Sequence, residues 1–241
     1  MHKKIIKIAV ALIVIGSVFA GAYYSYPKAS HYLAVKKAER LAEESVEEAT
    51  GEKPGAHYLE VPFICQAPLQ TTENWEFYEE SCEEAAVLQS YLFLTDQVMS
   101  KQQAHEEILR MIDWQMEHFG GHHDIYADKV KEFIHGYYEI PNEDIEIIYN
   151  ADLDIIKKYI SEGHPVIVPI TGNILKNPYY PHPGYHMLVV RGYTKDRIIT
   201  NDNGTRRGED FSYDNEVFIE AMNDAGGDIV VINAKTTTFS H

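Results

Sequence analysis

The feature that most constrains this chain is a run of twenty uncharged residues near its N-terminus, from Ile8 to Pro27: IAVALIVIGSVFAGAYYSYP. A helix of that length spans about 30 Å, close to the hydrocarbon thickness of a bilayer. Residues 1–28 are therefore predicted to contain a transmembrane helix that serves as a signal anchor. Lys3, Lys4 and Lys7 precede the run, and basic residues stay on the cytoplasmic side, so the rest of the chain is expected outside the cell.

A cleaved signal peptide is the alternative interpretation of the same segment. The stretches VFAG and AGAY offer the small residues that a signal peptidase requires near its cleavage site. In that case the protein would be secreted and would not remain in the membrane as a single-pass protein. Both interpretations predict export.

The charge balance excludes one large class of partner. The chain has 37 acidic and 21 basic residues, which gives a net charge of −16. Nucleic-acid binding depends on a basic surface that neutralises phosphates, and no basic stripe follows the N-terminal run. Binding to DNA or RNA is therefore not expected.

Residues 29–56 are expected to form a charged stalk. The segment SHYLAVKKAERLAEESVEEAT, over residues 30–50, has helical spacing and many charges. Ser30 is predicted to cap this helix, and Gly51 and Pro54 are predicted to end it. The globular domain is then expected to span residues 57–241.

Within that domain the pattern places helices mostly before strands, which favours an α+β fold over alternating βαβ units. Helices are predicted over residues 82–94, 101–119, 125–134, 151–161 and 215–222. Strands are predicted over residues 57–66, 145–149, 165–170, 185–193, 196–202 and 228–234. Ser100 and Gln103 have the spacing of a capping box for the second helix.

Cys82 has a contradictory environment. Ser81 and Glu84 have the spacing of a capping box, which would make Cys82 the first residue of a helix. A helix N-terminus lowers the pKa of a cysteine, whereas the neighbouring Glu83 and Glu84 oppose that effect. A reactive thiolate at this position would therefore require a cationic partner from elsewhere in the chain.

His186 and Asp202 are predicted to supply that partner. The segment GYHMLVVRGYTKDRIITNDNGT indicates two strands joined by a turn near residues 194–196, which brings His186 opposite residues 202–205. A carboxylate beside a histidine orients the imidazole and stabilises its cationic form. If this pair also meets Cys82, the set can perform nucleophilic catalysis.

Several motifs in order carry a family resemblance: VPFICQAP, Trp75, SCEEAA, GHPVIVPI, GYHMLVVRGY and NDNGTRRGEDFSY. Together they resemble the bacteriocin-processing (double-glycine leader) cysteine peptidase-like family, over residues 58–222. The resemblance implies a papain-like fold, in which an N-terminal helix carrying the nucleophile packs on a mainly antiparallel sheet. It implies an enzyme that hydrolyses peptide bonds in a peptide or protein substrate.

The same resemblance implies the role of each site residue. Cys82 is the implied nucleophile, His186 the general base and Asp202 the acid that orients it. Gln66 is the implied side-chain donor to the oxyanion. No metal ion or organic cofactor is implied.

The sequence departs from the family pattern at three positions. Glu83 follows the cysteine where glycine is usual, and Asn203 follows the aspartate where proline is frequent. Gln66 lies sixteen residues before Cys82, farther than in the transporter-linked peptidases. No transporter domain follows, so processing of a bacteriocin within its exporter is not implied.

Three other functions remain open at this point. The same fold and triad could act on cell-wall peptides as an amidase or endopeptidase, or the groove could serve an inactive surface binding module. A disulfide between Cys65 and Cys82 would instead indicate an adhesion domain, although Cys65 is expected to be a buried hydrophobic residue.

The other polar segments of the sequence are not predicted to take part in catalysis. The segment HFGGHHD, over residues 118–124, is expected to be a solvated loop and not a metal site. His182 lies in a loop rich in proline and tyrosine that could line a substrate groove. Arg206 and Arg207 are expected to be surface charges.

Overall fold

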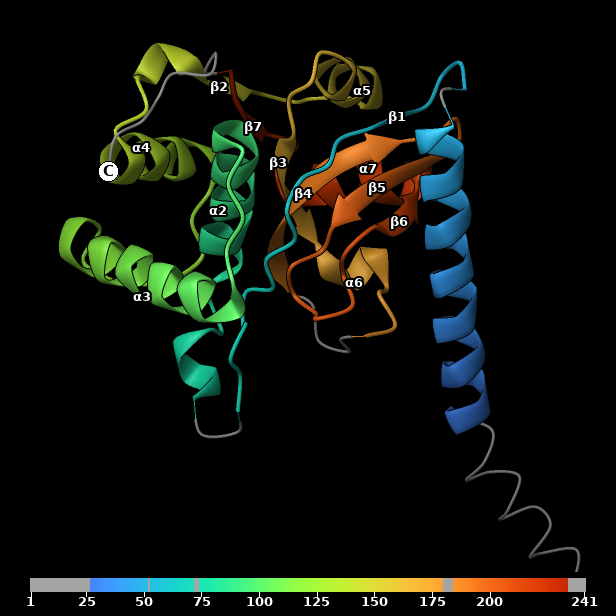
Figure 1. The fold of residues 1–241 in the computed structure, drawn as a ribbon, viewed down its shortest axis with the longest axis horizontal. Helices are drawn as coiled ribbons and strands as arrows, with labels where there is room; N and C mark the ends of the chain where they lie inside the picture. The colour runs from blue at the N-terminus through green and yellow to red at the C-terminus, as the bar shows by residue number, and fades with distance from the viewer. Residues whose placement is uncertain (1–26, 52, 72–73, 180–183, 234–241) are drawn as a thin grey trace, which may run out of the picture. The chain divides into compact units, whose positions relative to one another are not determined.

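The computed structural model describes residues 27–51, 53–71, 74–179 and 184–233 (Figure 1). The chain divides into two compact units, Met1–Arg40 and Leu41–His241. The predicted transmembrane segment, apart from Pro27, lies outside the described residues. Among the residues that are described, none of the helices combines the length and the apolar character needed to cross a bilayer.

A long helix covers residues 27–50. The expected cap at Ser30 is wrong, because the helix has already begun there and Ser30 Oγ donates to the Pro27 carbonyl at 2.9 Å. The last turns of this helix belong to the second unit and are less exposed than predicted. Ser45 is buried, and its Oγ lies 3.1 Å from the Oγ of Ser212.

The second unit contains short helices and a single sheet. The helices are η1 (Trp75–Phe77), α2 (Cys82–Thr95), α3 (Lys101–His118), α4 (Ala127–Tyr138), η2 (Asn142–Asp144), α5 (Leu153–Ser161), α6 (Gly172–Leu175) and α7 (Asn215–Asp224). The strands are β1 (His57–Tyr58), β2 (Ile145–Ile148), β3 (Val166–Thr171), β4 (Tyr185–Tyr193), β5 (Arg197–Asn201), β6 (Phe211–Asp214) and β7 (Ile229–Ile232). The α+β class is therefore as predicted.

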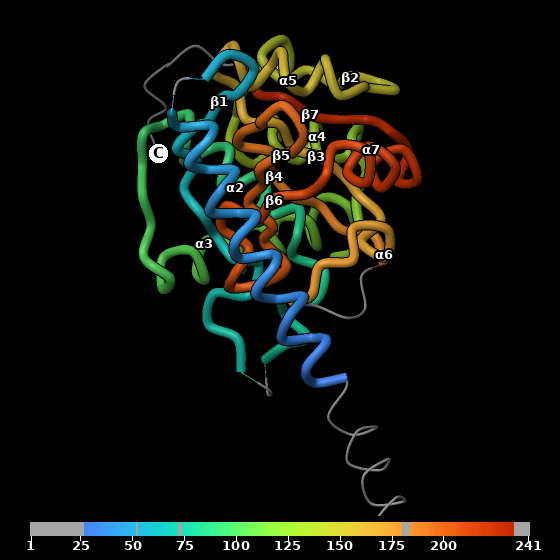
Figure 2. Tube along the Cα trace, turned by 90° about the vertical axis from the view of Figure 1, so that its right-hand side faces the viewer, coloured from blue at the N-terminus to red at the C-terminus, as the bar shows by residue number. Residues whose placement is uncertain are grey.

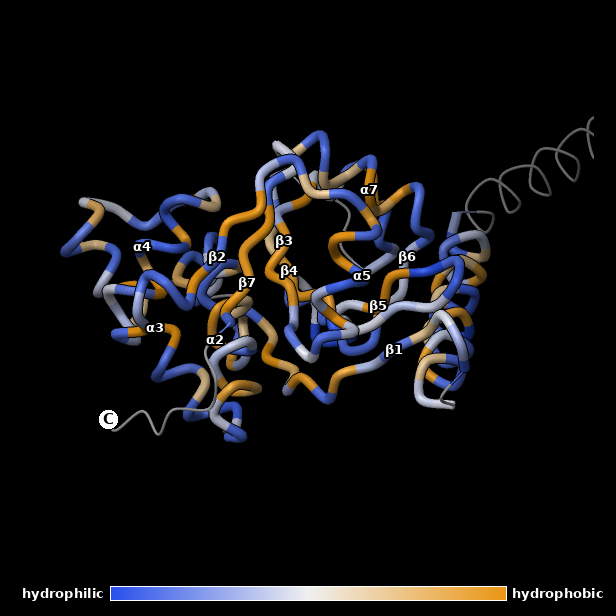
Figure 3. The backbone as a smooth tube through the Cα atoms, turned by 90° about the horizontal axis from the view of Figure 1, so that it is seen from above, coloured by the Kyte–Doolittle hydropathy of each residue, from blue (hydrophilic) through white to orange (hydrophobic). Residues whose placement is uncertain are grey.

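All described strand pairs are antiparallel, in the order β2-β7-β3-β4-β5-β6, and β1 pairs with β4. Strands β3, β4 and β7 are apolar along most of their length, which is visible in Figure 3, and β3 and β7 are buried on both faces. This central part of the sheet forms the core. Gly192 is required in β4, since a Cβ there would lie 2.8 Å from the backbone oxygen of His57 in β1.

The helices form two groups around the sheet. Helix α2 packs on β3 and β4 and also contacts α3 and α4, whereas α6 and α7 lie together at another side of the sheet (Figures 1 and 2). The start of α2 and the strand β4 therefore lie close together. This contact brings Cys82 and His186 into one region of the fold.

The structure differs from the predicted elements in one strand and in several short elements. The strand expected over residues 57–66 pairs with β4 only at His57 and Tyr58. Beyond them the chain stays extended but is held by isolated hydrogen bonds, such as Leu59 N–H to the Arg191 carbonyl at 2.7 Å. Helix α6 and strand β6 were not predicted, because each has only four residues and no clear periodicity.

Candidate active site

Cys82 is the first residue of α2, and its side chain is buried, with 4% of the residue surface exposed. The predicted capping box is wrong, because the Ser81 side chain makes no cap and lies instead 3.3 Å from the Phe77 carbonyl. Glu84 turns into the core, where Gln115 Nε2 donates to its Oε1 at 2.6 Å. The helix starts where predicted, but Ser81 and Glu84 do not cap it.

Glu83 binds the sulfur of Cys82 directly. The thiol donates to Glu83 Oε2 at 3.0 Å, and Glu83 Oε1 accepts from the backbone N–H of Ile125 at 2.8 Å. Glu83 itself is 1% exposed. Glu83, one of the three positions that depart from the family pattern, is therefore a fixed neighbour of the thiol.

The pKa of the Cys82 thiol is well above its ordinary value. Burial is the largest cause, because the thiolate loses its hydration, and the charge of Glu83 and its hydrogen bond raise the pKa further. Asp124 acts in the same direction, whereas the backbone N–H of Met187 lowers the pKa. The thiol is consequently protonated at neutral pH in this conformation.

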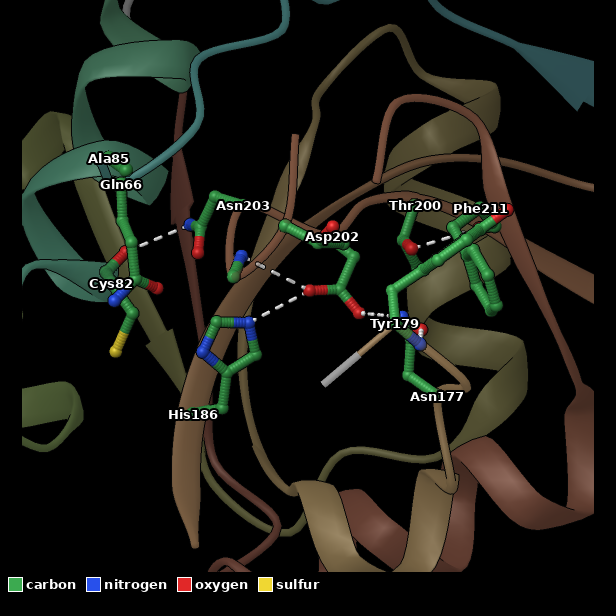
Figure 4. Close-up of polar contacts among 12 residues, drawn as sticks. Gln66, Cys82, Ala85, Asn177, Tyr179, His186, Thr200, Asp202, Asn203 and Phe211 are labelled. Carbon is green, nitrogen blue, oxygen red and sulfur yellow. Dashed lines mark hydrogen bonds and ion pairs between the residues drawn. The ribbon is translucent and has the colours of Figure 1, made fainter. Parts of the chain in front are cut away.

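His186 and Asp202 lie together, as the hairpin geometry predicted. His186 Nε2 is 3.0 Å from Asp202 Oδ1, and both side chains are buried (Figure 4). Since Nε2 faces the carboxylate, Nδ1 is the nitrogen that can exchange a proton with another group. In Figure 4 the Nδ1 edge of the ring is turned toward Cys82.

The Asp202 carboxylate is held by several donors. Asn177 Nδ2 donates to its Oδ2 at 2.9 Å, the hydroxyl of Tyr213 donates to the same oxygen, and the Gly204 N–H lies 3.3 Å from Oδ1. Glycine is required at position 208, in the loop after Asp202, since a Cβ there would lie 1.7 Å from the backbone oxygen of Asp202. These contacts fix the orientation of the Asp202 carboxylate.

The nucleophile candidate and the histidine are connected through β4. Helix α2 packs on β4, and the backbone N–H of Met187, the residue directly after His186, lowers the pKa of the Cys82 thiol. Strand β4 therefore brings the peptide that follows the histidine onto the first residue of α2. This is the contact between helix and hairpin that the sequence alone left as an inference.

Gln66 also reaches the start of α2, but its amide hydrogens are engaged there. Nε2 donates to the carbonyls of Tyr78 at 3.0 Å and Glu79 at 3.3 Å, in the turn that precedes the helix. Its backbone N–H donates to the Asn203 carbonyl at 2.9 Å. Gln66 therefore lies in the site region and fixes the turn that leads into Cys82.

The histidine-rich segment at residues 118–124 is not simply a solvated loop, so that expectation is wrong. His122 Nε2 lies 3.0 Å from the buried Glu84 Oε1, and its side chain is only 12% exposed. His118 stacks on Trp114, with ring centroids 4.1 Å apart. Carboxylates at the start of α2 therefore hold this loop beside Cys82.

One group of possible metal ligands occurs among the described residues. The ligand atoms of Cys82, Glu83 and Asp124 lie within 4.8 Å of one another. A cation bound there would occupy the sulfur and so compete with its use as a nucleophile.

The cysteines and the two arginines that the sequence singled out have contacts that can be described directly. Cys65 and Cys82 are both free thiols, so the disulfide alternative is not realised. Arg206 is exposed and donates to the Gln70 carbonyl at 3.1 Å, and Arg207 lies over the ring of Tyr179. His182 lies outside the described residues.

Sequence reasoning missed two residues that shape this site. Asn177 and Tyr213 both bind Asp202, from segments 25 and 11 residues away in the sequence. Asn177 precedes a proline and resembles an ordinary turn residue, and Tyr213 lies in the strand that was not predicted. No local spacing pattern connects either of them to Asp202.

Comparisons with known proteins agree with the fold. The sequence profile of the Peptidase C39-like family matches residues 58–227. Among curated proteins, none matches the chain. A crystal structure from Bacillus anthracis, assigned as a C39-like peptidase, has the same fold: the TM-score is 0.52 at 12% identity, over 74% of this chain and 96% of that one.

Proposed function

The chain belongs to the Peptidase C39-like family, and from that premise we propose that it is a cysteine peptidase that uses Cys82 as its nucleophile. In this proposal His186 is the general base and Asp202 orients it. The observation that carries the proposal is the 3.0 Å contact between His186 and Asp202, because His186 lies in β4 and the helix that begins with Cys82 packs on that strand. A cysteine at a helix start, with a carboxylate-oriented histidine beside it, is the arrangement that nucleophilic catalysis requires.

The raised pKa of Cys82 determines the order of proton transfer in this mechanism. The thiol is protonated before substrate binds and donates to Glu83, so its proton must turn from Glu83 Oε2 to His186 Nδ1 as the sulfur attacks the peptide carbonyl. The imidazolium then gives this proton to the leaving amine, and the peptide C–N bond breaks. Water hydrolyses the resulting thioester and releases the acid product and the thiol.

The oxyanion of the intermediate needs donors at the start of α2. The backbone N–H of Cys82 lies in the first turn of the helix, where N–H groups have no acceptor within the helix. The Gln66 amide is the second donor, and it would have to release one of its bonds to Tyr78 or Glu79. Removal of a single donor of this kind costs about 3–4 kcal/mol in other enzymes.

Covalent labelling of Cys82 tests the proposal without knowledge of the natural substrate. A peptidyl vinyl sulfone should form a single adduct on Cys82, detected by mass spectrometry of the full chain. His186→Ala should slow the adduct by about 10²-fold or more, because it removes the general base. His164→Ala, at a histidine outside the site, is the matched control. Equal labelling rates in all three proteins would exclude His186 as the base.

Glu83 gives a second expectation, for the pH dependence of the thiol. Burial and the neighbouring Glu84 raise the pKa of the Glu83 carboxyl itself, and the ionised Glu83 raises the pKa of Cys82. Glu83→Gln removes this charge and should lower the pKa of Cys82, while the glutamine oxygen still accepts from Ile125. The thiolate then forms at lower pH, and alkylation by iodoacetamide near pH 8 should become several-fold faster. The measurement is the alkylation rate of Cys82 between pH 6 and 11, by mass spectrometry. An unchanged midpoint would show that burial alone controls the thiol.

A further inference from the structure

Asn203, the residue after Asp202, links the two halves of the candidate site. Its Nδ2 donates to the backbone carbonyl of Cys82 at 3.0 Å, and its own carbonyl accepts from Gln66 N–H at 2.9 Å. Asp202 meanwhile holds His186. Two consecutive residues, with Cα atoms about 3.8 Å apart, therefore carry the bonds to all three other site residues (Figure 4).

Stability alone does not explain an asparagine at this position. Asn203 is fully buried, and within the described part of the chain its Oδ1 has no hydrogen-bond partner. Leaving a buried amide oxygen unpaired is unfavourable, and an apolar side chain of similar shape would avoid it. Only an amide at this position can donate the hydrogen bond to the Cys82 carbonyl and keep the size of the side chain.

We propose that Asn203 is a positioning residue that fixes the distance between the Cys82 sulfur and His186. It ties the first residue of α2 to the loop that carries Asp202, so the nucleophile and the base share one anchor. This role rests on the proposed function of Cys82 and His186. Proline, which the family resemblance favours after the aspartate, has no side-chain donor and could not form this bond.

The expected consequence of losing the bond is a misplaced nucleophile in a protein that still folds. Asn203→Leu keeps the size of the side chain but removes the donor to Cys82. A displacement of about 1 Å at reacting groups lowers the rate by about 10²-fold. Asn203 is buried and does not bind substrate in this scheme. Its replacement should therefore lower kcat by about 10²-fold, while KM changes little.

Asn215 provides a matched control. Its Nδ2 also donates to a backbone carbonyl, that of Lys195 at 2.9 Å, and its Oδ1 is likewise buried without a partner among the described residues. It lies at the start of α7 and makes no contact with the site residues that the structure records. Asn215→Leu should therefore lose a similar bond without a change in kcat. Both variants are compared at a temperature at which circular dichroism shows that they are folded.

A double-mutant cycle with His186→Ala tests the positioning role directly. Chloroacetamide is small enough to alkylate Cys82 without a substrate-binding step. Asn203→Leu should slow this alkylation by about 10-fold or more when His186 is present, and should have little further effect in His186→Ala, because the alignment no longer matters.

Two results would overturn the role of Asn203: an effect on kcat no larger than that of Asn215→Leu, or equal slowing of alkylation with and without His186. Failure of the proposed function itself would be seen separately. In that case His186→Ala alone, with Asn203 intact, would leave both peptide hydrolysis and Cys82 alkylation unchanged.

Discussion

Replacement of Cys82 by serine is expected to abolish peptide hydrolysis, with a fall in kcat/KM of about 10³-fold or more. Serine is nearly isosteric and can keep the hydrogen bond to Glu83. Its hydroxyl is a far weaker nucleophile than a thiol, and the buried site disfavours the alkoxide even more strongly than the thiolate. The thermal unfolding midpoint should therefore stay close to that of the unmodified chain while activity is lost.

Cys65→Ser is the matched control for this substitution. Cys65 is the other cysteine of the chain, is a free thiol, and has no role in the proposed mechanism. A fluorogenic peptide selected from a peptide library by the full chain provides the assay, and kcat/KM is compared among the three proteins. Activity retained by Cys82→Ser, or lost equally in Cys65→Ser, would reject Cys82 as the nucleophile.

Asp202→Asn is expected to have the second largest effect, a loss of about 10²- to 10⁴-fold in kcat. Two donors, Asn177 and Tyr213, converge on Asp202 Oδ2, so the amide oxygen of an asparagine must face them. The amide nitrogen then faces His186 and donates to Nε2, which forces the ring proton onto Nδ1. A histidine protonated at Nδ1 cannot accept the proton of Cys82.

Asp210→Asn is a suitable control for the loss of one negative charge. Asp210 accepts from Tyr58 at 2.8 Å and pairs with Arg191 at 3.0 Å, and both contacts lie outside the proposed catalytic groups. Its activity should stay near that of the unmodified chain. The pH profile of kcat provides the readout for Asp202→Asn. A variant that keeps more than about a tenth of the activity would contradict the orienting role.

The sequence predicted the parts of the fold that depend on local patterns. The capping box of Ser100 and Gln103 is present at the start of α3, and the turn between β4 and β5 lies where the strand pattern placed it. The turn places His186 near residues 202–205, but the β-bulge between Val190 and Gly192 shifts the register by one residue and so puts Asp202 on the same face as His186. The nearness of the two residues could therefore be predicted from one segment, whereas their shared face could not.

The sequence failed where side chains bind partners far along the chain. Ser81 and Glu84 have the local spacing of a capping box, but Glu84 lies in the core with Gln115 and His122, which are 31 and 38 residues away. A buried carboxylate requires such partners, and local spacing contains no information about them. The same reason explains why the histidine-rich loop was taken to be solvated.

The sequence left open what Glu83 does beside the thiol, and the fold answers this question. Glu83 is neither a surface charge nor a cap: it binds the sulfur and the backbone of Ile125 at once. Only the return of the chain at Ile125 gives Glu83 this second bond, and the sequence does not specify how that loop closes. The resemblance to a family implied a set of candidate site residues, but not this contact.

The packing of the long helix on β6 has a practical consequence for recombinant work. Ser45 Oγ lies 3.1 Å from Ser212 Oγ, which in turn donates to the carbonyl of Leu41 at 3.1 Å. A truncated fragment that begins at His57, where the strand pattern starts, would lack both partners and leave the outer strand of the sheet uncovered at Ser212. Fragments designed for crystallisation should therefore begin at or before Leu41, so that the protein is expressed with its own cover over β6.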